Sequence, residues 1–270
     1  MQRSLIVLFR LLPLWLMYGV MALVIPFYVL LDGRSRRASY RFARRIGYGL
    51  LRSAWHVYAN MFNMGMLVMD RFSVYAGKRF RLISDRQDLY LRLSAQEGGF
   101  MMLSSHLGHF EMAGYMFRSP KTTYALVYAG ETATVMQNRS RIFGNANVQM
   151  IPVSKDLSHI FALNAALANG QIVTIPADRV WGSSKSLRRP FMGAEAAFPA
   201  GPFTLAVQRE VPVLAVFAVK EGLRTYRVIL EELPVGAGRE ALADAYSATL
   251  ERVARRYPNQ WYNFYDFWAA

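Results

Sequence analysis

An uncharged stretch near the N-terminus constrains the fold more than any other feature of this 270-residue chain. From Leu11 to Leu31, 21 consecutive residues carry no charged side chain. A helix of about 20 apolar residues is long enough to cross the hydrocarbon core of a bilayer. Two arginines precede the stretch, and seven follow it: Arg34, Arg36, Arg37, Arg41, Arg44, Arg45 and Arg52. Because Lys and Arg accumulate on the cytoplasmic side of membrane segments, this asymmetry predicts an N-terminal anchor followed by a cytoplasmic domain.

Two other interpretations of the stretch stay open. Pro13 and Pro26 make a straight span less favourable, so a helix lying in one leaflet is an alternative. A cleaved signal peptide is less favoured, since the apolar stretch is long and no small-x-small cleavage site follows it. The position of the arginine run indicates contact with anionic headgroups, although such runs usually form a solvated helix face.

The charge balance narrows the class of partner. Lys and Arg number 32 against 18 acidic residues, which gives a formal net charge of +14. Such an excess favours nucleic acid, an acidic protein or substrate, or anionic lipid. No recognised nucleic-acid motif accompanies the basic stretch, so we expect an anionic membrane surface and no nucleic acid. The chain has no cysteine, which excludes a thiol nucleophile, disulfides and a Cys-based zinc site.

After Gly77, short apolar runs alternate with amphipathic stretches. Four runs bounded by turn residues are typical of buried strands: Phe100–Leu103, Tyr124–Val127, Ile172–Ile175 and Val213–Val219. The same reasoning adds a strand at Tyr226–Leu230 and helices at Leu157–Ala168, Phe203–Arg209 and Glu240–Arg255. The pattern predicts an α/β fold, with a mixed central sheet flanked by helices and an N-terminal membrane-anchoring helix.

We divide the chain into three parts. Residues 1–32 form the membrane anchor, residues 33–76 a basic juxtamembrane helical segment, and residues 77–270 the α/β domain. Between residues 38 and 75, apolar side chains recur every three or four positions, as expected for helices.

The segment from Ser104 to Glu111 carries the chemistry. It follows the first predicted strand and precedes a helix expected at Met112–Phe117. Residues five apart on one helix point about 140° away from each other, so His106 and Glu111 could not meet there. We therefore expect His106 in a turn to which Gly108 lends backbone freedom, with Glu111 in the first helical turn. Its carboxylate could then orient the imidazole, as in hydrolytic triads.

A metal site is not expected at this segment. His106, His109 and Glu111 have no convincing third or fourth ligand group nearby. The His106 imidazole would instead act as a general base, and the hydroxyl or amine of an acceptor molecule would be the nucleophile.

Four blocks occur in order along the chain. They are Ser-Ser-His-Leu-Gly-His-Phe-Glu at residues 104–111, Ile-Pro-Ala-Asp-Arg-Val-Trp-Gly at 175–182, Arg-Pro-Phe-Met-Gly at 189–193 with Pro-Ala-Gly-Pro at 199–202, and Tyr-Pro-Asn-Gln-Trp-Tyr at 257–262. The first resembles the His-x4-Asp/Glu block of the lysophospholipid acyltransferase superfamily. Together the blocks are most similar to the lipid A biosynthesis lauroyl/myristoyl acyltransferase family, with Arg179 where the family usually has Gln.

This resemblance implies an acyltransferase at the cytoplasmic face of a bacterial inner membrane, with residues 77–270 as the acyltransferase domain. The enzyme would move a fatty acyl chain from acyl carrier protein or coenzyme A to a hydroxyl or amine of a lipid or glycolipid. Lipid A-type acylation is favoured, although His109-Phe110 replaces the family's usual Asn-Trp and leaves an aminolipid or a polyene-type glycolipid open. No cofactor beyond the thioester co-substrate is implied.

The resemblance also assigns roles to residues. His106 would be the general base and Glu111 its orienting partner, with an apolar site for the acyl chain beside them. Asp178 and Arg179 would shape the site. Three basic residues, Lys185, Arg188 and Arg189, would hold phosphates, unless they form a solvated loop. A thioester or lipid hydrolase of the same fold and a non-catalytic basic membrane-binding protein are the alternative functions.

Overall fold

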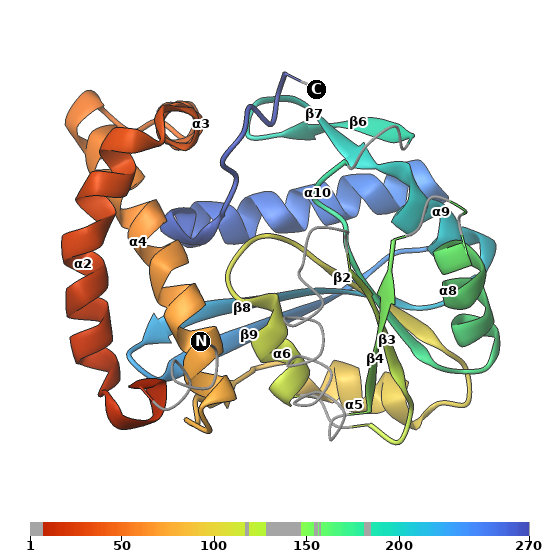
Figure 1. Ribbon diagram of the computed structural model, residues 1–270. Coiled ribbons are helices and arrows are strands. Elements are labelled where there is room, and N and C mark those ends of the chain that lie inside the picture. The colour runs from red at the N-terminus through yellow and green to blue at the C-terminus, as the bar shows by residue number, and fades with distance from the viewer. Residues whose placement is uncertain are drawn as a thin grey trace.

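The protein is built around a seven-stranded sheet (Figure 1). The computed structural model describes residues 8–116, 119–127, 147–153, 156, 158–180 and 185–269. The strands, in sheet order, are β1 (Arg81–Ile83), β9 (Thr225–Leu233), β8 (Val213–Gly222), β2 (Phe100–Ser104), β5 (Ile172–Pro176), β3 (Thr123–Val127) and β4 (Val148–Pro152). β8 and β9 pair antiparallel, and the other neighbours pair parallel. The predicted mixed sheet is confirmed.

Two helical layers bury the sheet. Met101 and Leu103 of β2 point into a cluster with α8 (Ser158–Ala168), α9 (Ala200–Gln208) and α10 (Arg239–Arg256). Phe100 and Met102 point the other way, into a cluster with α5 (Gln87–Ala95) and α6 (Phe110–Met116). Because successive strand residues face opposite sides, a strand covered on both faces is apolar throughout. This is why the short apolar runs predicted the central strands correctly.

Three helices precede the sheet: α2 (Leu14–Leu31), α3 (Gly33–Arg45) and α4 (Leu50–Tyr75). Figure 1 shows α2 and α4 side by side at one end of the molecule, in red and orange. The helices expected between residues 38 and 75 are confirmed, and they are interrupted at Gly47, whose φ is +93°. By length and composition, α2 is apolar enough to cross a membrane.

Several elements escaped prediction. The outer strands β1 and β4 and the helix α5 were missed, as was a separate antiparallel pair of β6 (Ser186–Phe191) and β7 (Ala194–Pro199). The strand β6 has the sequence Ser-Leu-Arg-Arg-Pro-Phe, and only its last residue is buried. Strands at a surface lack the apolar run that marks a buried strand.

Candidate active site

The strand β2 leads into a sharp turn at the centre of the sheet. β2 lies between β5 and β8, and residues 105–109 connect it to α6. Gly108 has a φ of +68°, and a Cβ there would lie 2.1 Å from the carbonyl oxygen of Ala218 on β8. Only glycine tolerates both this left-handed backbone and this close approach. The predicted backbone freedom of Gly108 is confirmed.

The C-terminal block holds the turn by backbone hydrogen bonds. The N–H of Gly108 donates to the carbonyl oxygen of Gln260 at 2.7 Å, and the N–H of Tyr262 donates to that of His106 at 2.9 Å. The short helix η2 (Pro258–Gln260) supplies part of this support. Two blocks that lie about 150 residues apart in sequence are therefore one structural unit.

A carboxylate from β5 contacts the His106 imidazole. β5 is the parallel neighbour of β2, and the N–H of Ala177 donates to the carbonyl of Ser104 at 2.9 Å just beyond the strand. Asp178 Oδ1 lies 2.8 Å from His106 Nδ1, and Asp178 Oδ2 accepts the backbone N–H of His106 at 2.8 Å. An ionised carboxylate only accepts hydrogen bonds, so in the neutral imidazole Nδ1 carries the proton and Nε2 the lone pair.

The electrostatic environment of Asp178 keeps its carboxyl ionised. Burial raises the pKa of its carboxyl, but the charge and two hydrogen bonds of His106, together with Arg179, outweigh burial and hold the pKa below its usual value. The Asp178 side chain is 3% exposed, whereas that of His106 is 29% exposed. The buried Asp178 carboxylate thus holds an imidazole whose other edge is open to a substrate.

Glu111 lies in the first turn of α6, as predicted. Its carboxylate pairs with the guanidinium of Arg71 on α4 at 3.0 Å, and the Glu111 side chain is 2% exposed. Nδ1 of the imidazole is contacted by Asp178, and the role of Glu111 as the orienting partner of His106 stays a prediction. Asp178 reaches the turn because the carboxyl ends of adjacent parallel strands meet at one edge of the sheet, and it follows the end of β5.

An apolar cavity of about 290 Å³ lies beside His106. Its walls come from β2, β3, β4, β5 and α6 and include Met102, Leu126 and Met150. Arg71, His106 and Glu111 line its polar part. Walls of this kind favour an apolar chain with a reactive polar end.

A second cavity, of about 410 Å³, also has His106 in its wall. Three arginines line it: Arg34 of α3, Arg71 of α4 and Arg179 after β5. The guanidinium of Arg179 donates to the carbonyl of Tyr262 at 3.3 Å. Apart from Asp32, which accepts from Ser35 at the start of α3, the described charged residues of this wall are cationic. Such a pocket favours an anionic group.

The other predicted basic residues lie apart from these cavities. Lys185 and Arg188 are exposed beside and on β6, and Arg189 Nε lies 3.6 Å from Asp244 Oδ1 on α10. None of the three is among the described residues that line either cavity. Their role in binding phosphates stays a prediction. Trp181 and Gly182, which end the second block, lie outside the described residues.

Sequence reasoning missed Arg71. It follows Asp70 near the C-terminal end of a long helix, where no local pattern distinguishes it from a solvated side chain. Arg34 belonged to the basic run but was assigned to the membrane. In the part of the chain that the structure describes, no group of three or more His, Cys, Asp or Glu side chains could hold a metal ion.

Fold and site together define a class of α/β protein in which an aspartate-oriented histidine lies between an apolar and a cationic cavity. A family model described as bacterial lipid A biosynthesis acyltransferase matches residues 53–269. The chain therefore belongs to the bacterial lipid A biosynthesis acyltransferase family, as the four blocks indicated. Membership gives the reaction class, acyl transfer from an acyl donor to a lipid acceptor. No curated protein matches the chain.

Proposed function

We propose that the protein moves a fatty acyl chain from a thioester, carried by acyl carrier protein or coenzyme A, to a hydroxyl or amine of a lipid or glycolipid. A lipid A-type acceptor, at the cytoplasmic face of a bacterial inner membrane, is the form that the family favours. The observation that carries the proposal is the position of His106 in the walls of both cavities. The acyl chain would occupy the apolar cavity, and the acceptor would approach from the cationic one.

In this mechanism His106 Nε2 takes the proton of the acceptor hydroxyl as its oxygen attacks the thioester carbonyl. A C–O bond forms, the C–S bond breaks, and the imidazolium returns the proton to the departing thiolate. Asp178 keeps the proton on Nδ1 and stabilises the imidazolium, which makes it the orienting carboxylate in our proposal. Glu111 positions Arg71 at the boundary between the cavities.

The cationic groups have two proposed tasks. Arg34, Arg71 and Arg179 bind an anionic group of the acceptor, because they surround the cavity beside the base. Lys185 and Arg188 lie on an exposed basic surface that suits phosphates or an acidic carrier protein. The net charge of +14 favours electrostatic steering of such a carrier.

The test uses the purified full chain, a labelled acyl thioester and lipid vesicles with or without acceptor lipid. We expect His106→Ala to abolish acyl transfer while far-UV circular dichroism stays unchanged. His159→Ala, on α8 and outside both cavities, is the matched control and should retain activity. Near-normal transfer by His106→Ala would contradict the proposal.

The same assay separates the alternative functions. Rapid release of free fatty acid in the absence of acceptor would indicate a hydrolase. No thioester turnover under any condition would indicate a non-catalytic membrane-binding protein. Mass spectrometry of lipids from a strain that lacks the protein would identify the acceptor, since the missing acylated species names it.

A further inference from the structure

Helix α2 has two faces with different surroundings. Leu14 and Ile25 are buried, whereas Trp15, Leu23 and Phe27 are at least 64% exposed. Leu50, Leu51 and Trp55 at the start of α4 are also exposed. Large apolar side chains exposed in such number on α2 and α4 indicate an interaction site.

The inner face of α2 packs along α4 for most of its length. A Cβ at Gly65 of α4 would lie 2.7 Å from Met21 Cγ, so glycine permits the close approach of the two helices. The hydroxyl of Tyr58 donates to the carbonyl oxygen of Ala22 at 3.3 Å. The two helices are therefore one unit held by packing and by polar contacts.

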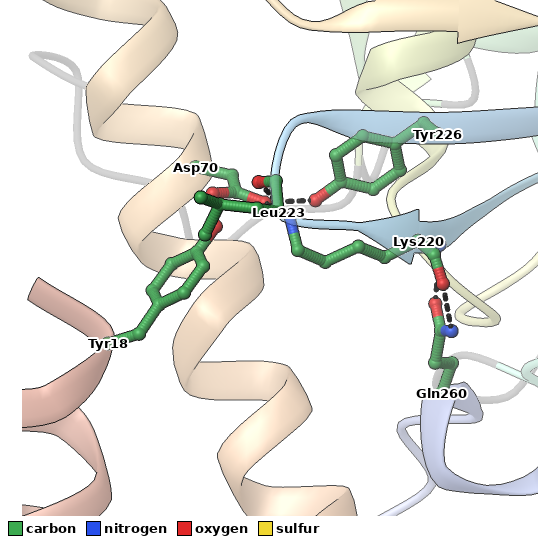
Figure 2. Close-up of polar contacts among 6 residues, drawn as sticks. All are labelled: Tyr18, Asp70, Lys220, Leu223, Tyr226 and Gln260. Carbon is green, nitrogen blue, oxygen red and sulfur yellow. Dashed lines mark hydrogen bonds and ion pairs between the residues drawn. The ribbon is translucent and has the colours of Figure 1, made fainter. Parts of the chain in front are cut away.

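A buried polar cluster bonds this unit to the sheet (Figure 2). The Asp70 carboxylate of α4 is fully buried and accepts hydrogen bonds from Tyr18 of α2 and Tyr226 of β9. Lys220 Nζ of β8 lies 2.6 Å from Asp70 Oδ2. The backbone of Lys220 in turn exchanges two 2.8 Å hydrogen bonds with the Gln260 carboxamide, beside the catalytic turn.

This arrangement conflicts with a membrane span by α2. If α2 crossed the bilayer as packed, α4 and the charged Asp70–Lys220 pair would enter the hydrocarbon core, where ions are costly. If α2 left α4 in order to cross, the buried carboxylate would lose the Tyr18 donor. α4 cannot follow α2, because Asn60 donates to the carbonyl of Trp261 at 3.0 Å and Arg71 binds Glu111.

We propose that α2 does not span the membrane but lies in one leaflet. Its exposed face, together with Leu50, Leu51 and Trp55, inserts among the lipids of an anionic leaflet. The charge of the neighbouring segments fits that partner, since seven exposed arginines stand just before α2, in α3 or in the first turn of α4: Arg10, Arg34, Arg37, Arg41, Arg44, Arg45 and Arg52. The proposal concerns membrane docking and does not depend on the reaction that the site performs.

The absence of cysteine makes the topology directly measurable. Leu11→Cys and Leu31→Cys mark the two ends of the apolar stretch, and Ala237→Cys marks the α/β domain. Each is expressed in bacteria and treated with a membrane-impermeant maleimide in right-side-out and inverted membrane vesicles. We expect all three to react only in inverted vesicles. Reaction of Leu11→Cys and Leu31→Cys from opposite sides would overturn the proposal.

A depth measurement and a binding measurement complete the test. A spin label at Val20→Cys should lie at the same depth as labels at the two ends, whereas a maximum depth at Val20 would indicate a span. The surface variant Leu50→Ser/Leu51→Ser should weaken binding to phosphatidylglycerol-containing vesicles by about tenfold or more. Leu91→Ser on α5, which is also exposed, is the control. Equal binding by all variants, or binding unaffected by replacing phosphatidylglycerol with phosphatidylcholine, would overturn the proposed surface.

Discussion

Replacing Asp178 by Asn tests which carboxylate serves His106. In the protein, Asp178 Oδ2 accepts the backbone N–H of His106 while Oδ1 meets Nδ1. A carboxamide has one oxygen, and the backbone N–H requires it, so the NH2 group must face Nδ1. That orientation forces the proton onto Nε2, where the base needs its lone pair. In Asp178→Asn, the geometry therefore predicts that His106 adopts the wrong tautomer while the shape of the site is retained.

The expected magnitude follows from this geometry. A triad whose histidine is held in the wrong tautomer loses about four orders of magnitude in kcat, and each factor of ten corresponds to about 1.4 kcal/mol of activation free energy. For Asp178→Asn we expect kcat to fall by about 10³–10⁴, which is about 4–5.5 kcal/mol. KM for the thioester should change little, because Asp178 is buried behind the imidazole.

Glu111→Gln is the matched variant. It keeps the shape of the side chain and removes the charge that pairs with Arg71. We expect it to raise KM for the acceptor and to lower kcat by less than about 30-fold, since the imidazole retains its own carboxylate. Both variants are assayed with one acyl thioester and one acceptor lipid at saturating and limiting concentrations. If Glu111→Gln loses more kcat than Asp178→Asn, then Glu111 is the orienting residue and our mechanism is wrong.

Three further predictions concern the turn, a buried histidine and the apolar cavity. Gly108→Ala should lower the free energy of unfolding by at least about 1–2 kcal/mol from its left-handed backbone alone. It should also abolish turnover, because the new Cβ displaces the turn from Ala218. Chemical denaturation and the transfer assay check these two effects, and unchanged activity would contradict the prediction. Burial lowers the pKa of His56 to about 4 despite its hydrogen bond to Asn259. Between pH 6.5 and 4 the unfolded chain therefore binds more protons than the folded protein, and the free energy of unfolding should fall by about 3 kcal/mol as the pH falls through that range. His56→Gln should flatten this dependence in pH-resolved denaturation. Ala125→Phe on β3 should fill the apolar cavity and shift the preference toward shorter acyl chains. The loss of binding free energy should be about 0.8 kcal/mol for each methylene that no longer fits. Competition between thioesters of different length measures this shift.

The Asp70 cluster links helix α2 to the turn that carries His106. Burial raises the pKa of the Asp70 carboxyl, although Lys220 and two tyrosine hydroxyls oppose the effect. Removing one partner of such a pair leaves the other charge buried and unpaired, whereas removing both together is tolerated better. The cluster thus ties the position of α2 to the strand that supports Gly108.

Local sequence determined the strand–turn–helix segment that carries His106. The apolar run of β2, the glycine at the turn and the start of α6 all depend on residues close together in the chain, and periodicity and turn chemistry report them directly. The mixed sheet, the helices before it and the family also followed from patterns and blocks in the sequence. For the same reason, Glu111 was the expected partner of His106, because it is the nearest carboxylate in the segment.

Tertiary structure alone decided which groups meet at the site. Asp178 lies 72 residues from His106 and reaches it only because β5 pairs with β2. Arg71 pairs with Glu111 only because the fold brings the end of α4 within reach of the first turn of α6. Strand order and helix packing depend on the burial of both faces of the sheet at once, a property of the whole chain that no local pattern encodes. The same holds for α2, whose composition permits a span and whose packing on α4 and bond to Asp70 favour a helix in the membrane plane.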